Sequence, residues 1–352
     1  MRHTSIESVE SGQVLGKSIY TSDGRTLLHA NVLLTPMMIT QLRRIGVTML
    51  YIKDKHFADV HIEDMVSEKT RRETLSQVSE SMQCVQDGKN IDMKNVTKTV
   101  TNMVDEIVGN KNILLQLDDV RTKDNHLFIH SLNVCMTSTI IGINLGYNAD
   151  KLRDLALGAL FHDIGKVVKE NDPIRRNTDK KDQEHHAWVG FNVLRKKHEL
   201  NLASAHVSLQ HHEHVDGTGL PRGLKNDEIH EYAKIVAVAN YYDNLISEFS
   251  SEPTYMPYQA SEFIMGLAGR HFDHTITVNF LRSIALYPTG TSVKLNTGEI
   301  GVIVGQHKGL PSRPIVRVIR KKNGDSFNFE EPEVKEIDLA TATTIFIEEV
   351  LN

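Results

Sequence analysis

This chain of 352 residues contains few cysteines, no excess of basic residues and no long apolar run. The two cysteines, Cys84 and Cys135, do not suggest a disulfide framework, so we expect a reducing compartment. The net charge of −5 excludes the global basic field that attracts DNA. No apolar run approaches the roughly 20 residues of a membrane helix, and the polar start MRHTSIESVE argues against a signal peptide. The sequence therefore predicts a cytoplasmic protein without a membrane or DNA partner.

What is present is ordinary for a protein with a buried core: 40% hydrophobic and 24% charged residues. The patterning divides the chain into four parts, and the fold class that it predicts is mostly α. The parts are a small α/β N-terminal domain at 1–60, a helical linker at 61–111, a helical domain at 112–286 and a β-rich C-terminal segment at 287–352.

Local signals support this division. Ser22-Asp23-Gly24 predicts a hairpin turn between two short strands. Thr35 and Pro36 predict the start of a helix, as N-cap and first residue, and Gly46 predicts its end. In the linker, apolar residues at helical spacing before and after 87–90 predict two amphipathic helices. A narrow apolar stripe must be covered, so we expect these helices to pack on a neighbouring domain or subunit.

Histidines crowd one part of the helical domain: ten of the 18 lie between His126 and His214. His162 and Asp163 end an apolar helix, where a buried carboxylate is costly unless a cation compensates its charge. Asp163 can bridge two metal ions, and His162 can offer one nitrogen. Lys166, one turn further, can hold a phosphate oxygen. His130 on the preceding predicted helix and Asp243 on a later one complete the pattern.

His130, His162, Asp163 and Asp243 form a signature that resembles the HD superfamily of metal-dependent phosphohydrolases. Two further segments narrow the resemblance to the HD-GYP family. Glu184-His185-His186-Ala187-Trp188-Val189-Gly190 resembles that family's His-Pro-x-x-Gly segment. His211-His212-Glu213, followed by Asp216-Gly217-Thr218-Gly219 and Pro221-Arg222-Gly223-Leu224, resembles its HHExxDGxGYPxGL run. The resemblance covers about 112–295 and implies a helical HD-domain core that hydrolyses the bacterial messenger cyclic di-GMP.

The resemblance also implies a ligand set for two transition-metal ions. One ion would be held by His130, His162, Asp163 and Asp243, and the other by Asp163, His186, His211 and His212. Nitrogen and carboxylate ligands suit iron, manganese, zinc or nickel, and iron or manganese is the expected pair. His126 either binds a third ion or is only a polar helix start. Asp163 and Lys166 are the expected catalytic residues, with Lys166, Asp216, Gly217 and Leu220 at the substrate.

Two departures from the family pattern leave alternatives open. Leu220 stands where the family has the GYP tyrosine, and no arginine follows Asp243 before Arg270. The leading interpretation is a phosphodiesterase that converts cyclic di-GMP to pGpG or GMP. A second keeps the metals but takes another cyclic dinucleotide or linear pGpG. A third is an inactive module that binds nucleotide or a GGDEF-domain partner. A homodimer is compatible with each of them.

Overall fold

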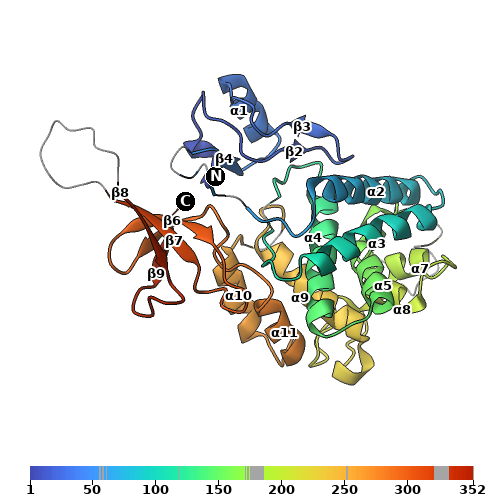
Figure 1. The fold of residues 1–352 in the computed structure, drawn as a ribbon. Helices are drawn as coiled ribbons and strands as arrows, with labels where there is room; N and C mark the ends of the chain where they lie inside the picture. The colour runs from blue at the N-terminus through green and yellow to red at the C-terminus, as the bar shows by residue number, and fades with distance from the viewer. Residues whose placement is uncertain are drawn as a thin grey trace, which may run out of the picture.

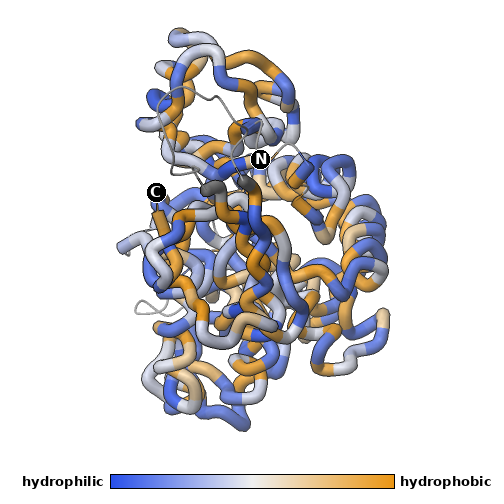
Figure 2. Tube along the Cα trace, turned by 60° about the vertical axis from the view of Figure 1, so that its left-hand side comes forward, coloured by the Kyte–Doolittle hydropathy of each residue, from blue (hydrophilic) through white to orange (hydrophobic). Residues whose placement is uncertain are grey.

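The computed structural model (Figure 1) describes the chain except residues 55, 56, 58, 61, 118, 171, 173, 175–185, 251, 252, 321–332 and 352. Glu184 and His185 of the sequence motif therefore lie outside the described residues. Helices dominate the described chain, and a C-terminal antiparallel sheet follows them, so the predicted mostly α class is confirmed. Figure 2 shows short hydrophobic stretches alternating with hydrophilic ones along the trace, as amphipathic elements require.

The N-terminal unit has its own small core. Its elements are β1 (Arg2–Ser5), η1 (Ile6–Ser8), β2 (Ile19–Tyr20), β3 (Thr26–Leu28), α1 (Pro36–Arg44) and β4 (Met49–Ile52). The predicted hairpin is present, because β2 pairs antiparallel with β3. Thr35 caps α1 by accepting a hydrogen bond from the Met38 amide, and Gly46 follows the helix with a φ of 93°. Strand β1 was not predicted, and it pairs antiparallel with β4.

Two helices follow, α2 (Glu68–Gln86) and α3 (Met93–Gly109). Their apolar stripes, which include Val78, Met82, Val96 and Val100, belong to the same buried cluster as the helices of the next segment. The prediction that these stripes pack on a neighbouring domain is therefore confirmed.

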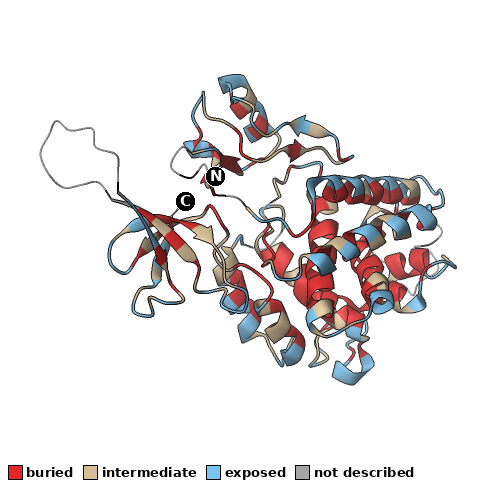
Figure 3. Cartoon of the chain, in the orientation of Figure 1, coloured by how far each residue is buried: buried red, intermediate tan, exposed pale blue. Residues whose placement is uncertain are grey.

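The helical domain is built around α4 (His126–Asn144), which Figure 3 shows in the buried colour over most of its length. Around it lie α5 (Ala149–Leu160), η3 (Ile164–Val167), α7 (His186–Leu194), α8 (Leu202–Gln210), η4 (Asn226–Glu228), α9 (Glu231–Leu245), α10 (Pro257–Gly266) and α11 (His274–Leu281). By length and composition alone α4 could cross a membrane, but 78% of the qualifying window is buried in the fold, as in a core helix.

The C-terminal segment folds into one antiparallel sheet. Its strands are β5 (Ser292–Leu295), β6 (Ile300–Gly305), β7 (Ile315–Arg320), β8 (Glu333–Asp338) and β9 (Ile347–Leu351), in the order β8-β7-β6-β5-β9. Val293, Leu295, Ile303, Val316 and Val318 form its buried face. The β-rich character predicted for this segment is confirmed.

Candidate metal centre

The His162-Asp163 pair lies in the turn between α5 and η3. Helix α5 ends at Leu160, two residues before the His162-Asp163 pair that was expected to end it, and Gly165 lies inside η3. A Cβ on Gly165 would meet the His186 carbonyl oxygen at 2.0 Å and the Gly190 amide nitrogen at 2.7 Å. Glycine is therefore needed because η3 touches the start of α7. This contact brings His186 beside Asp163.

Asp163 is fully buried and faces two groups of imidazoles, one with each oxygen. Its Oδ2 lies 3.5 Å from His130 Nε2 and 3.4 Å from His162 Nε2. Its Oδ1 lies 3.1 Å from His186 Nε2 and 3.5 Å from His211 Nε2. His212 joins the second group, with its Nε2 3.1 Å from His186 Nε2. Six of the seven predicted ligands thus meet as two clusters that share Asp163.

The protonation of these rings can be read from their outer nitrogens. His162 Nδ1 lies 2.8 Å from the Ala159 carbonyl oxygen, and His211 Nδ1 lies 2.9 Å from that of Ser208. A carbonyl only accepts, so both Nδ1 atoms carry the proton, and both Nε2 atoms present lone pairs. These lone pairs point at the Asp163 carboxylate, whose Oδ1 is buried without a hydrogen bond. Such an arrangement is repulsive unless a cation lies between the groups.

The donor set therefore fits divalent metal ions, as an HD domain implies. Imidazole nitrogens bind such ions at about 2.0–2.1 Å, which places neighbouring ligand atoms roughly 3.0–3.4 Å apart. The His130 and His162 Nε2 atoms are 3.2 Å apart, and those of His186 and His211 are 3.3 Å apart. Histidine with a carboxylate suits a transition metal better than calcium or magnesium.

Electrostatics favours the protonation states that metal binding requires. Burial opposes ionisation of Asp163, but the imidazoles of His162, His130 and His186 outweigh it and hold the pKa of Asp163 well below its usual range. Burial lowers the pKa of His211 to about 3. Burial likewise lowers the pKa of His162. At neutral pH the carboxylate is charged and these two imidazoles are neutral, which is the form that binds metal.

Asp243 lies elsewhere than the predicted ligand set requires. Its carboxylate accepts two hydrogen bonds from Arg121, at 2.5 and 2.9 Å, and one from Asn133 at 3.1 Å. Its Oδ2 also lies 2.7 Å from His130 Nδ1. Asp243 therefore holds the outer nitrogen of His130, which turns His130 Nε2 toward Asp163. Among the described residues it belongs to neither cluster.

Arg121 was missed in the sequence because it lies outside every recognised motif, nine residues before His130. Its guanidinium, with His130, outweighs the burial of Asp243 and keeps the pKa of that carboxyl below its usual range. The predicted burial of Asp243 could have indicated such a residue, since a buried carboxylate needs a cationic partner.

His126 lies outside both clusters as well. Its Nδ1 lies 2.9 Å from the Lys123 carbonyl oxygen, and its ring stacks on Phe249 with the centroids 5.2 Å apart. These neighbours, a carbonyl and a ring, fit the helix-start alternative, and a third metal ion at His126 stays a prediction.

The glycine-rich loop folds back onto the histidine pair. Glu213 is 2% exposed, and its carboxylate accepts hydrogen bonds from the amides of Arg222 and Leu224. A Cβ on Gly219 would meet the His214 amide nitrogen at 2.2 Å, so only glycine permits this return. The Leu220 amide donates to the His212 carbonyl at 2.9 Å, and the Leu220 side chain is 57% exposed. Leu220 thus lies beside His212 and faces solvent.

The remaining predicted site residues differ in their surroundings. The Lys166 side chain is 42% exposed, and its Nζ lies 2.5 Å from Asp163 Oδ2. The Asp216 carboxylate accepts hydrogen bonds from the amide and hydroxyl of Thr218. Gly217 has a φ of 83°, which a turn of this kind favours. Asp216 and Gly217 therefore stabilise the conformation of the loop. Lys166 lies at the edge of the metal centre, with part of its side chain in solvent.

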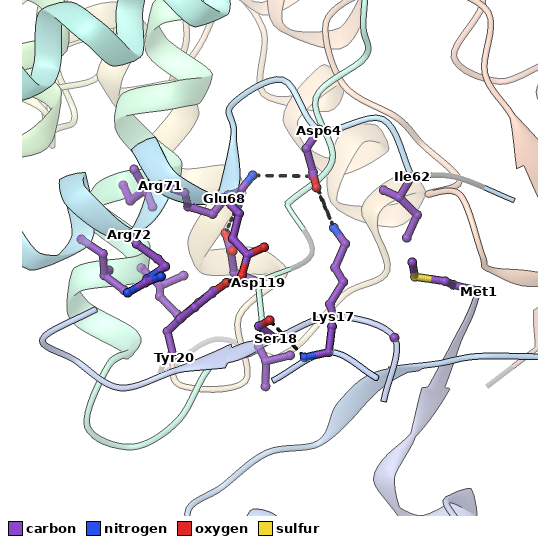
Figure 4. Close-up of a pocket in the computed structure, with 16 residues that line it drawn as sticks. Met1, Lys17, Ser18, Tyr20, Ile62, Asp64, Glu68, Arg71, Arg72 and Asp119 are labelled. Carbon is purple, nitrogen blue, oxygen red and sulfur yellow. Dashed lines mark hydrogen bonds and ion pairs between the residues drawn. The ribbon is translucent and has the colours of Figure 1, made fainter. Parts of the chain in front are cut away.

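A separate cavity of about 230 Å³ lies between the N-terminal unit and α2 (Figure 4). Four of its six charged side chains form pairs: Lys17 with Asp64 at 3.3 Å, and Arg71 with Asp119 at 2.5 Å. Figure 4 shows Asp64 between Lys17 and Arg71. The Lys17–Asp64 ion pair across this cavity connects the N-terminal unit with the segment before α2. No residue of the two metal-ligand clusters lines the cavity.

Comparison with known proteins identifies the family that this chain resembles. The HD domain family matches residues 115–276, and a KOW domain associated with HD domains matches residues 292–352. Cyclic di-GMP phosphodiesterase PA4108 of Pseudomonas aeruginosa is 30% identical over 239 residues, which cover 66% of this chain and 57% of the relative. Cyclic di-GMP phosphodiesterase PdeB of Borreliella burgdorferi is 24% identical over 65% of this chain and 60% of its own length. The chain thus spans less than two thirds of these relatives.

A solved structure shares the fold. Bd1817, a HDG"Y"P protein from Bdellovibrio bacteriovorus, superimposes with a TM-score of 0.50 and 18% identity, over 79% of this chain and 97% of that one. The KOW match explains the C-terminal sheet, for which the sequence analysis found no motif. Residues 115–276 therefore match the HD domain family, and residues 292–352 match a KOW domain of the kind associated with it.

Proposed function

We propose that this protein is a metal-dependent phosphodiesterase that hydrolyses cyclic di-GMP to pGpG or GMP. The observation that carries the proposal is Asp163, a buried carboxylate with a separate imidazole group at each oxygen. The relatives named above are cyclic di-GMP phosphodiesterases, which supports the choice of substrate.

The proposed ligands are His130, His162 and Asp163 for one ion, and Asp163, His186, His211 and His212 for the other, with iron or manganese as the expected metals. Bound there, two close metal ions supply a hydroxide nucleophile at neutral pH and stabilise charge on a phosphodiester. Asp243 orients His130 and keeps its Nδ1 in place, as outer carboxylates do for metal-binding histidines.

The chain's own residues then bind and orient the substrate. Lys166 Nζ can donate to a non-bridging phosphate oxygen, since its side chain reaches solvent beside Asp163. Leu220 offers an apolar surface beside His212. Asp216 and Gly217, predicted as substrate contacts, are proposed instead to keep the loop in shape. The predicted domain division, cytoplasmic location, GGDEF-domain partner and homodimer are retained as proposals.

The test of the ligand set is a metal count. Full-length protein reconstituted anaerobically with iron and manganese should hold about two ions per chain, measured by plasma mass spectrometry. Asp163→Ala should lose both ions because it serves both clusters, whereas Asp243→Ala should weaken mainly the ion at His130. Fewer than one ion per wild-type chain would contradict the proposal, as would an Asp163→Ala protein that keeps both.

A further inference from the structure

A large cavity lies where the N-terminal unit, the helical domain and the C-terminal sheet meet. Its volume is about 800 Å³, which is within the range of roughly 300–1,000 Å³ typical of small-molecule sites. Residues of β4, of the segment that leads into α4, of the chain after α9 and of β9 contribute to its wall.

The lining combines aromatic rings with carboxylates. The rings include Phe249, Tyr255, Tyr258 and Tyr287. Two of the acidic residues are already paired: Asp119 with Arg71 at 2.5 Å, and Glu348 with Lys294 at 3.0 Å. Such a wall repels phosphate but accepts a neutral, flat ring that carries hydrogen-bond donors.

The cavity adjoins the metal centre through Arg121. Arg121 lines the cavity and binds Asp243, which in turn holds His130 Nδ1 at 2.7 Å. Ile246, Glu248 and Phe249 follow Asp243 within two helical turns and line the same cavity. The cavity wall is therefore separated from the proposed ligand His130 by one ion pair, Arg121 with Asp243.

Glu248 is the lining carboxylate best placed to recognise a nucleotide base. It is exposed, and it makes no hydrogen bond or ion pair with any residue that the structure describes. The Watson–Crick edge of guanine presents two adjacent N–H donors, which match the two oxygens of a carboxylate. The same edge of adenine presents a ring-nitrogen acceptor, which a carboxylate repels.

We propose that this cavity is a guanine subsite and that Glu248 selects guanine over adenine in the cyclic dinucleotide. The proposal rests on the proposed function. It also offers a replacement for the missing tyrosine, because rings of the cavity wall supply stacking surfaces.

The test compares cyclic di-GMP with cyclic di-AMP on the full-length, metal-loaded protein. Both kcat/KM by chromatography and Kd by calorimetry on metal-free protein are measured for wild type, Glu248→Gln and the control Glu262→Gln. Glu262 lies on α10 outside the cavity lining, so its variant makes the same charge change without touching the subsite. Metal content is measured for every variant.

Wild type should prefer cyclic di-GMP. Glu248→Gln should lower that preference at least about fivefold, since a good base-edge contact is worth about a 5- to 150-fold discrimination. Glutamine can pair with adenine, so affinity for cyclic di-AMP should rise. Metal content should stay unchanged, and Glu262→Gln should behave as wild type.

The outcomes separate the two proposals. If wild type cleaves or binds cyclic di-GMP but Glu248→Gln keeps the wild-type preference, the guanine subsite is wrong and the proposed function stands. If wild type neither binds nor cleaves either dinucleotide, both proposals fail. A loss of preference in Glu262→Gln as well would also overturn the assignment, because it would show a general charge effect.

Discussion

Asp163 is the residue on which the metal centre depends. Its two oxygens face imidazole lone pairs from opposite sides, and Oδ1 has no hydrogen bond. The Lys166 ammonium lies 2.5 Å from Oδ2, whereas the groups that face Oδ1 among the described residues are imidazoles. A buried carboxylate whose charge is only partly compensated is costly. The residue-scale explanation is that the missing charge belongs to bound metal, and that His162 and His211 are kept neutral by burial to receive it.

His211 makes the metal-free protein sensitive to acid. Its folded pKa of about 3 lies below the unfolded value of about 6.5, so the unfolded chain binds the extra proton between these values. The free energy of unfolding should therefore fall as pH drops below about 6.5. Thermal unfolding of chelator-treated protein at pH 8, 7, 6 and 5 measures this.

The control for that series is His211→Gln, which has no titrating group at this position. Its melting temperature should decline less steeply between pH 7 and 5 than that of wild type. Parallel declines in the two proteins would show that burial of neutral His211 is not a source of the acid sensitivity.

Leu220 offers a second test at the residue scale. Its side chain is 57% exposed beside His212, so a larger ring fits without crowding the interior. Restoring a stacking surface is worth about 1–3 kcal/mol per base, or a factor of about 5 to 150. Leu220→Tyr should raise kcat/KM for cyclic di-GMP in that range, with metal content and melting temperature unchanged. A lower melting temperature with unchanged kinetics would mean that Leu220 only packs the turn.

The sequence motif predicted six of the metal ligands but did not predict Arg121, which lies outside the motif. Six predicted ligands meet in the two clusters because their spacing along the helices is specific. Asp243 turned instead toward Arg121, and no periodicity marks Arg121 as its partner. Pairing between distant residues depends on how α4 and α9 pack, which the order of residues alone does not reveal.

At the scale of elements, two glycines decide how closely the site can assemble. Gly165 in η3 and Gly190 in α7 both lie where a Cβ would enter a neighbour: Gly165 against His186, and Gly190 against the Ser208 hydroxyl at 2.2 Å. Together they let η3, α7 and α8 touch. The three elements carry His186 and lead to Asp163 and His211, so the approach of the backbones sets the ligand distances.

Gly165→Ala should therefore damage both stability and metal binding. The clash is with backbone atoms, which cannot move aside cheaply, and overpacking of this kind typically costs about 1–3 kcal/mol. We expect a lower melting temperature and loss of the ion at His186, measured by calorimetry and metal analysis. Gly266→Ala is the control, because nothing lies within 4 Å of its Cβ position. Normal metal content in Gly165→Ala would contradict this account of the contact.

Local sequence signals predicted which helices and strands form more reliably than where a helix ends or which strands pair. Thr35 caps α1, the break at 87–90 separates α2 from α3, and the five-stranded sheet lies within the segment predicted to be β-rich at 287–352. The apolar helix was expected to end at His162 and Asp163, but α5 ends at Leu160, and Gly165 lies in η3 against α7. Strand β1 was missed because its pairing with β4, nearly 50 residues away, supplies its stability.

At the scale of the molecule, the N-terminal unit touches both other parts. The Lys123 amide donates to the Ile45 carbonyl at 3.0 Å, and the Asn125 side chain donates to the Tyr20 carbonyl at 2.9 Å. On the other side, Arg317 of the C-terminal sheet binds Asp59 at 2.7 Å. The segment that carries Arg121 toward Asp243 is thus held by the N-terminal unit, so the site depends on the intact chain.

The most direct measurement is turnover of cyclic di-GMP by the full-length, metal-loaded protein, followed by chromatography of the products. The account predicts that pGpG or GMP forms and that His212→Ala, which removes a proposed ligand and with it part of the source of the nucleophile, abolishes product formation. Intact cyclic di-GMP after prolonged incubation with fully metallated wild type would contradict the account and favour a nucleotide-binding module without catalysis.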